Sequence, residues 1–198
     1  MQSEFPATST IAEVLPVFYS KYELGADGGL SADTVKIVFF KNFYVYIPNI
    51  EDRRKAVLKH DIHHIITGYK SDFTGETEIA AWELAGGCRK YWVAAVLDMS
   101  GFAWGCLFNL PRVFDAFVTG RRTRNLYDDS IPDSAALKMT LLELRTRLGL
   151  ETATDRKPTS KETLLFLWFG VRAAVHTVLS VLLVPPLIVY TVVVALRK

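Results

Sequence analysis

The sequence predicts a mainly α-helical domain with a metal site between two helices, followed by a C-terminal transmembrane or re-entrant helical segment. Three observations lead to this prediction. Apolar residues recur at helical spacing through most of the first 150 residues. Three of the four histidines lie at positions 60 to 64, and residues 177–196 carry no charged side chain. The expected division is a helical domain at 1–150, a polar linker at 151–162 and a membrane segment at 163–198.

Composition excludes several classes of protein. The net charge is only +2 with no long basic run, so nucleic acid is not an expected partner. The two cysteines, Cys88 and Cys106, form no C-x-x-C, which excludes a cysteine-rich zinc ribbon and a disulfide scaffold. We expect both to be small core residues. The N-terminus lacks the basic and apolar regions of a signal peptide, and Glu4 argues against a transit peptide.

The first elements are expected in the following order. Residues 11–22 predict a short helix that Pro16 interrupts. Residues 34–48 are rich in β-branched and aromatic side chains, so a strand and a buried helix both stay open. Residues 50–68 have a helical period, begin with acidic side chains and end at Gly68.

Further helices follow a short polar connector. Asp72 or Thr74 is placed to cap a helix over 75–88. Residues 91–108 are almost all apolar or small, and we expect a buried core helix rather than a membrane span, because Asp98 would be costly in lipid. Residues 134–150 predict an amphipathic helix that Gly149 ends.

The tail has the composition of a membrane segment. Residues 177–196 are long enough to cross a hydrocarbon core at about 1.5 Å per residue. The pair Pro185–Pro186 predicts a kink in one span, with a re-entrant hairpin as the alternative. We expect residues 163–176 to lie at the membrane interface. Basic residues flank both ends, so charge does not fix the orientation.

Helical geometry sorts the histidines. At 100° per residue, His64 falls about 40° and Asp61 about 100° from His60, on one arc beside the apolar face. His63 falls on the other side and is expected to be solvent-exposed. Two imidazoles one turn apart can bind a single ion. The alternative is an exposed polar helix face without a metal.

Glu76 supplies the remaining ligand of the predicted site. It follows His64 by twelve residues, and Gly68 between them permits a turn that would bring the two helices together. Glu78 is the competitor for this position. Two nitrogen and two oxygen ligands suit Zn²⁺ and also Fe²⁺ or Mn²⁺. The predicted metal ligands are His60, Asp61, His64 and Glu76.

Other metal chemistries do not match the sequence. A His-Asp phosphohydrolase needs a histidine upstream, and residues 1–59 contain none. A ferritin-like di-iron site needs two E-x-x-H motifs, and a zincin needs glutamate where this chain has Asp61. A desaturase-like site needs more than four histidines.

The stretch "HDIHHIITGYKSDFTGE", residues 60–76, resembles the signature of the coenzyme Q (ubiquinone) biosynthesis protein 4 family, H-D-x-x-H-x11-E. His60, Asp61, His64 and Glu76 match it position for position. "TGRRTRNL" and "LLELRTRLGL" resemble further stretches of that family, and the resemblance covers roughly residues 10–150. The apolar tail is not typical of the family, so the chain resembles a divergent member with a C-terminal membrane segment.

The resemblance implies a mostly helical protein that acts on polyprenylated aromatic quinone precursors. It implies a divalent ion, zinc first, on the four matched residues, with no catalytic residue beyond them. The implied reaction replaces the ring C1 carboxylate by hydroxyl, an oxidative decarboxylation. Implied partners are the precursor or another isoprenoid lipid, other quinone biosynthesis proteins and the membrane. The lack of a targeting segment predicts a bacterial inner membrane, with the domain on its cytoplasmic face. With such a substrate, lining a channel for the isoprenoid tail is the alternative to core packing for residues 91–108. The alternatives are a non-catalytic lipid-binding scaffold and a different metal-dependent membrane enzyme on the same fold.

The basic stretch "GRRTRN", residues 120–125, has two interpretations. It is placed to contact anionic lipid headgroups beside the membrane. A solvated basic loop explains the sequence equally well.

Overall fold

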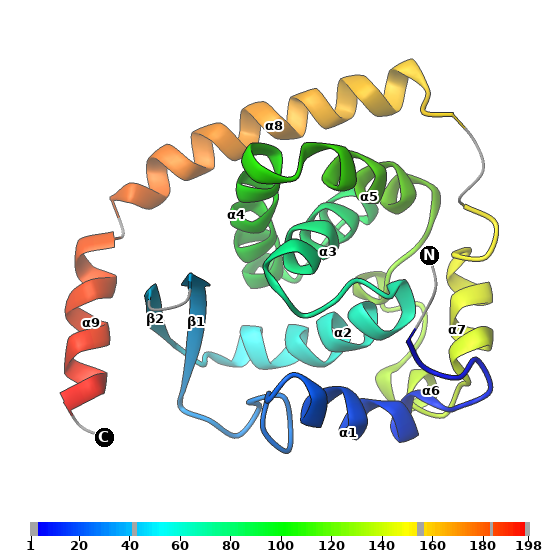
Figure 1. Cartoon of the computed structure of the whole chain (residues 1–198), viewed down its shortest axis with the longest axis horizontal. Coiled ribbons are helices and arrows are strands. Elements are labelled where there is room, and N and C mark those ends of the chain that lie inside the picture. The colour runs from blue at the N-terminus through cyan, green and yellow to red at the C-terminus, as the bar shows by residue number, and fades with distance from the viewer. Residues whose placement is uncertain (1–3, 41–42, 154–156, 183, 197–198) are drawn as a thin grey trace.

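The chain is mainly helical, as the sequence predicts (Figure 1). A computed structural model describes residues 4–40, 43–153, 157–182 and 184–196. The elements, in chain order, are α1 Ile11–Lys21, β1 Thr34–Phe40, β2 Phe43–Pro48, α2 Glu51–Thr67, α3 Phe73–Gly86, α4 Trp92–Phe108, α5 Leu110–Arg122, the 3-10 helix η1 Leu126–Asp128, α6 Asp133–Ala136, α7 Leu141–Leu148, α8 Ser160–Val181 and α9 Val184–Leu196.

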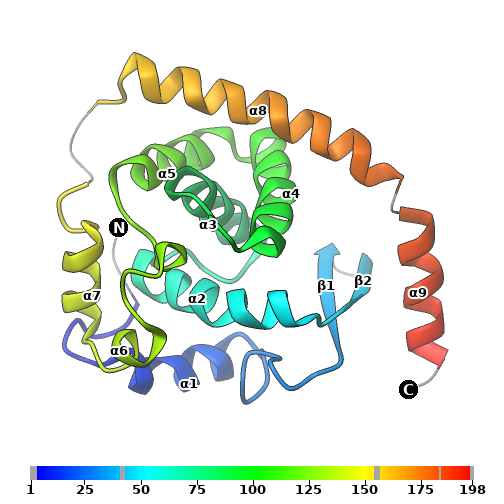
Figure 2. The same ribbon diagram turned by 180° about the vertical axis from the view of Figure 1, so that it is seen from behind.

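Helix α3 lies at the centre of the domain, with α2, α4 and α5 around it (Figures 1 and 2). Ile79 and Trp82 of α3 have no exposed surface. The neighbouring helices approach closely because they present glycine. A Cβ atom on Gly120 of α5 would lie 2.3 Å from the Trp82 carbonyl oxygen, and one on Gly105 of α4 would lie 2.8 Å from the Thr77 Cβ. This packing fixes α3 against the rest of the core.

The predicted end of α2 at Gly68 is confirmed, and of the two predicted caps Asp72 is the one that begins α3, which covers Phe73–Gly86 instead of the predicted 75–88. Gly68 ends α2 in the left-handed conformation, with φ 76°. Asp72 caps α3, where the Gly75 N–H donates to its carboxylate at 2.9 Å. Gly149 ends α7 as predicted, but the single helix predicted over 134–150 is wrong: α6 ends at Ala136, and α7 begins at Leu141 behind a Thr140 capping box. These caps set the short connector that joins α2 to α3.

The prediction that Pro16 interrupts the first helix is wrong. Pro16 lies inside a continuous α1. A capping box at Thr10 and Glu13 stabilises the helix before the proline, and Phe18 after it is buried in the core. Packing on both sides outweighs the hydrogen bond that the proline cannot donate.

Within residues 34–48, β1 and β2 pair as antiparallel strands, which decides between the two predicted alternatives; residues 41–42 lie outside the described part of the chain. Thr34 lies opposite Pro48, and Val35 lies opposite Ile47. This pair of strands does not join a larger sheet in the part of the chain that is described. Helix α9 lies beside β2 (Figures 1 and 2), and the Tyr46 N–H donates to the Thr191 hydroxyl at 3.1 Å.

Helix α4 is buried on one face only, so the predicted core helix is partly correct. Asp98 and Phe102 are buried, while Val96, Leu107 and Phe108 are exposed. Cys88 and Cys106 are free, as expected.

The apolar tail forms two helices, which corrects the prediction of one kinked span over residues 177–196. Helix α8 begins at Ser160, inside the expected linker, and ends at Val181. Pro185 and Pro186 lie in the first turn of α9, where proline fits a helix start but cannot continue the helix before it. Among the described residues, α8 is the one helix long and apolar enough to cross a membrane. With 13 residues, α9 is about 20 Å long and too short to cross alone.

Candidate metal centre

Helices α2 and α3 bring three of the four predicted ligands together. Ligand atoms of His60, His64 and Glu76 all lie within 4.8 Å of one another. The two histidines are one turn apart on α2, and Glu76 lies in the first turn of α3. The His64 side chain is 1% exposed, whereas those of His60 and Glu76 are 25% and 44% exposed. The group is therefore closed on the His64 side and open on the other.

Hydrogen bonds assign the tautomer of both histidines. Nδ1 of His64 lies 2.9 Å from the Tyr69 carbonyl oxygen, which can only accept. Nδ1 of His60 lies 3.1 and 3.2 Å from the two carboxylate oxygens of Glu83. Each Nδ1 therefore carries a proton, and each neutral ring has its lone pair on Nε2.

The two Nε2 lone pairs and a carboxylate point at one place. Nε2 of His60 lies 3.2 Å from Nε2 of His64. The Glu76 oxygens lie 3.5 Å from the first and 3.3 Å from the second. Acceptors this close need a cation between them, either a proton or a metal ion. Ligands bound tetrahedrally at about 2.0–2.1 Å lie about 3.3 Å from one another, so these residues fit a divalent ion such as Zn²⁺.

The charges around the site favour a cation. Burial lowers the pKa of His60, but the charge of Glu83 and the bond to Glu76 outweigh it and raise that pKa well above its usual value. Burial raises the pKa of Glu76, but the nearby His64 and His60 outweigh it and hold it well below its usual value. Both shifts favour a proton between His60 and Glu76 when no metal is bound.

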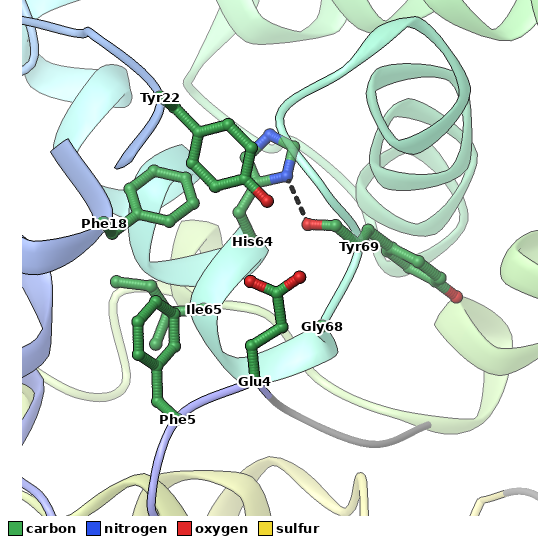
Figure 3. Close-up of a pocket in the computed structure, with 8 residues that line it drawn as sticks. All are labelled: Glu4, Phe5, Phe18, Tyr22, His64, Ile65, Gly68 and Tyr69. Atoms are coloured by element: carbon green, nitrogen blue, oxygen red, sulfur yellow. Dashed lines mark hydrogen bonds between the residues drawn. The ribbon is translucent and has the colours of Figure 1, made fainter. Parts of the chain in front are cut away.

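Two aromatic side chains at the C-terminal end of α1, Phe18 in the helix and Tyr22 just after it, cover His64. Figure 3 shows Phe18 and Tyr22 beside the imidazole, with the bond to the Tyr69 carbonyl dashed. The Phe18 ring stacks on it with centroids 5.9 Å apart. The hollow between these side chains holds about 10 Å³, too little for more than a water molecule. A substrate would therefore reach the metal from the His60 and Glu76 side.

The structure places Asp61 outside the group of three. Its carboxylate faces the Tyr19 hydroxyl and the loop at Gly28, where a Cβ atom would lie 2.7 Å from Asp61 Oδ2. Neither Asp61 Oδ2 nor the Tyr19 hydroxyl has a well-formed hydrogen bond to a described residue. Burial raises the pKa of Asp61 to about 6, against the lowering effect of His60 and His64. A role for Asp61 as a fourth ligand stays a prediction.

The prediction that His63 is solvent-exposed is wrong. His63 has no exposed surface. Its Nε2 accepts from the Leu126 N–H at 2.9 Å, so its Nδ1 carries the proton and donates to Glu83 at 2.5 Å. The helical spacing of 100° per residue correctly places His63 on the other side of His60 from the predicted ligands. That side of α2 faces η1 and α3 instead of water.

Glu83 is the residue that the sequence interpretation missed. It has no exposed surface, and its carboxylate accepts from Nδ1 of His60, from Nδ1 of His63 and from the Tyr127 hydroxyl at 3.3 Å. Burial raises its pKa, but the charge of His60 and these bonds outweigh it and lower the pKa. Glu83 lies seven residues after Glu76, two turns along the same face of α3, and this spacing could have identified it.

A second acidic side chain completes an inner network. Asp98 of α4 lies beside Glu83 and His60, and their ligand atoms also come within 4.8 Å of one another. Burial and the Glu83 charge raise the pKa of Asp98 well above its usual value. The Cys88 thiol donates to it at 3.3 Å. We interpret His60, Glu83 and Asp98 as a hydrogen-bond network and not as a second metal site, because His60 turns its protonated Nδ1 toward Glu83.

Glu78, the alternative to Glu76, points away from the histidines. Its carboxylate lies 4.0 Å from an Arg112 nitrogen. Both side chains line an open cavity of about 450 Å³ on the far side of the α2–α3 connector, together with Lys70 and Asp72. The geometry therefore selects Glu76 for the site.

The basic stretch at 120–125 bonds within the protein. Arg121 donates to the Ala85 carbonyl at 2.8 Å, and Arg122 donates to Glu162 at 2.7 and 2.9 Å. Arg124 pairs with Asp128. Arg121 and Arg124 are exposed despite these bonds, so a solvated basic stretch and a contact with lipid headgroups both stay predictions.

Comparison with family models, with curated proteins and with solved structures found no match for this chain.

Proposed function

We propose that this chain is a metal-dependent protein of ubiquinone biosynthesis, a divergent member of the coenzyme Q biosynthesis protein 4 family. The observation that carries the proposal is the convergence of His60 Nε2, His64 Nε2 and the Glu76 carboxylate, with both Nδ1 protons held by acceptors. The three residues also have the spacing of the family signature. The proposed metal is Zn²⁺, with Fe²⁺ or Mn²⁺ as alternatives.

The ligand set favours an enzyme over a purely structural site. Structural zinc sites are closed by four protein ligands, while catalytic sites keep a position open. Here three side chains converge, and the His60 and Glu76 side is partly exposed. A bound ion would act as a Lewis acid toward a carboxylate or phenolic oxygen of the substrate.

The protein's own residues orient the ligands. Glu83 fixes the His60 ring from behind, and the Tyr69 carbonyl fixes the His64 ring. Phe18 and Tyr22 keep water from the closed face of His64. These contacts leave the open face to a polyprenylated aromatic precursor, for which we propose C1 oxidative decarboxylation and hydroxylation.

The proposed location is a membrane, the inner membrane of a bacterium, with the helical domain on the cytoplasmic side. The length and composition of α8 support a membrane location. The precursor carries a polyprenyl tail that stays in the bilayer, so the metal site has to work beside it. We propose that other quinone biosynthesis proteins bind this protein at the same membrane.

A second candidate is a non-catalytic lipid-binding scaffold. The exposed apolar side chains of α4, α8 and α9 favour it, because they offer a large lipid-compatible surface. In that case the ion would join α2 to α3 without chemistry. The two candidates differ in what loss of the metal does to quinone synthesis.

The test is complementation of a quinone-deficient bacterial host lacking the corresponding gene, combined with metal analysis of the purified chain. We expect wild-type protein to carry about one divalent ion and to restore quinone. His64→Ala should lose the ion and accumulate precursor. Glu78→Gln, at the acidic residue of α3 that points away from the histidines, should behave as wild type. A metal-free wild-type protein with full quinone synthesis in His64→Ala contradicts the proposal. Loss of metal with normal quinone selects the scaffold.

A further inference from the structure

Helix α8 has two apolar faces, and one of them binds the domain. Phe166 packs against three aromatic rings of α4 and α5, and the Phe169 ring lies 5.3 Å from that of Phe117. Ala173, two turns after Phe166, is also buried. The ring centroids of Phe102, Phe114 and Phe117 lie 5.3, 5.0 and 5.4 Å from that of Phe166.

Polar contacts fix α8 at both ends of this face. Arg122 of α5 donates to Glu162 near the start of α8, with both residues mostly buried. His176 bonds the Ser100 hydroxyl of α4 at 3.0 Å. The contacts from Glu162 to His176 cover about 21 Å at 1.5 Å per residue. Figures 1 and 2 show α8 lying across α4 and α5 instead of projecting from the domain.

The opposite face of α8 is apolar and exposed. At 100° per residue its large side chains occupy an arc of about 120°, centred about 180° from Ala173. Arg172 lies outside this arc, and its guanidinium group lies over the Phe169 ring at 5.1 Å. The side chains of the outward arc, each at least 56% exposed, are Leu164, Leu167, Trp168, Val171, Val175, Val178, Leu179 and Leu182.

The outward arc fits lipid better than protein. A soluble amphipathic helix turns polar side chains outward, and a protein interface adds a polar rim with hydrogen bonds. From Leu164 to Leu182 the arc contains no polar side chain, and Lys161 in the first turn lies at its edge. The exposed apolar surface continues on α9, where Val189 and Leu196 are 64% and 82% exposed. An apolar surface of this extent, with no charged side chain on the arc between Leu164 and Leu182, matches the acyl region of a bilayer.

We propose that α8 lies in the plane of the membrane surface and does not cross it. Its inward face stays bound to α4 and α5, and its outward arc enters the boundary between headgroups and acyl chains. A helix that crossed the bilayer would meet lipid on all sides and would lose the Phe166, Ala173 and Glu162 contacts. In an ordinary interfacial helix, the side turned away from the lipid carries polar side chains and faces water. In α8 that side packs against the domain instead. This inference rests on the proposed membrane location but not on the metal or the quinone precursor.

The first experiment measures binding of the full chain to phosphatidylcholine vesicles by flotation. Neutral lipid suffices because the arc carries no charge. We expect wild-type protein to float with the vesicles and the triple variant Leu167→Glu/Val171→Glu/Val175→Glu to bind at least about tenfold more weakly. Val17→Glu, at a similarly exposed apolar position on α1, is the matched control and should bind as wild type. His64→Ala should also bind as wild type, which separates this inference from the metal proposal.

The proposal is overturned if the triple variant still binds fully. It is also overturned if wild-type protein does not bind the vesicles but forms a dimer, and the triple substitution abolishes that dimer. In that case the outward arc binds a second copy of the chain instead of lipid.

The second experiment separates lying in the plane from crossing. Ser160→Cys and Ser180→Cys place one thiol at each end of α8. In sealed inverted membrane vesicles, we expect a membrane-impermeant maleimide to label both positions from the outside, with the wild-type chain showing the background from Cys88 and Cys106. Labelling of one position only after detergent is added would show that α8 crosses the membrane and would refute the inference.

Discussion

Glu83 and His60 form the contact on which the candidate metal centre depends: the buried carboxylate accepts the Nδ1 proton of the imidazole at 3.1 Å. This bond turns the Nε2 lone pair of His60 toward His64 and Glu76. The same carboxylate accepts from His63, which joins α3 to the chain at Leu126. One side chain therefore orients a ligand and anchors the core beside it.

Glu83→Gln should weaken metal binding without changing any ligand. A neutral amide still fills the space, but it stabilises the protonated His60 Nδ1 less and lowers the basicity of Nε2. We expect a loss of about 10- to 100-fold in metal affinity, measured by competition with a coloured chelator. Glu78→Gln on the same helix is the matched control and should keep wild-type affinity. Unchanged metal affinity in a folded Glu83→Gln protein would show that Glu83 does not support metal binding by His60.

Asp61→Asn tests whether the ion has a fourth protein ligand. The structure places the Asp61 carboxylate beside Tyr19 and Gly28, outside the group formed by His60, His64 and Glu76. We therefore expect Asp61→Asn to retain about one ion per chain, with an affinity loss at least about tenfold smaller than that of His64→Ala. X-ray absorption on the zinc-loaded proteins gives the number of protein ligands directly. An affinity loss equal to that of His64→Ala would restore the four-ligand site of the family signature.

Metal removal should lower thermal stability through the same three residues. An ion that binds only the folded chain adds about 2.7 kcal/mol to its stability at a concentration 100 times Kd. We expect Tm to rise on adding Zn²⁺ to the stripped protein, to fall again with a chelator and to stay constant in His64→Ala. Calorimetry measures both changes. An equal rise in Tm for His64→Ala would mean that the ion binds elsewhere.

The sequence predicts the site helices well because their signals are local. Gly68 and Asp72 end and begin helices through their own backbone and side-chain bonds, and Glu76 follows from the spacing between them. The environment of His63 could not be predicted in this way. Its burial depends on Leu126, 63 residues away, which no local pattern indicates.

The tail shows a similar limit. Hydropathy locates an apolar segment but does not distinguish a face that binds protein from one that binds lipid. Phe166 and Leu167 are both apolar neighbours on α8, yet one is buried against α4 and the other is exposed. Only the packed structure distinguishes the two faces of α8. Pro185 lies in the first turn of α9, so the proline pair marks the start of that second helix.

Gly28 provides a stability test of the contact between the loop and Asp61. A Cβ atom there would lie 2.7 Å from Asp61 Oδ2 and 2.9 Å from the Tyr19 hydroxyl, at a φ of 67°. Gly29 is the matched control, because its φ is 78° and nothing lies within 4 Å of its Cβ position. Gly29→Ala should cost about 1–2 kcal/mol for the left-handed backbone alone. Gly28→Ala pays the same backbone strain and in addition crowds two buried polar groups, which adds about 1–3 kcal/mol. Urea unfolding of the two variants measures the difference, and equal costs would show that Asp61 and Tyr19 do not pack against this loop.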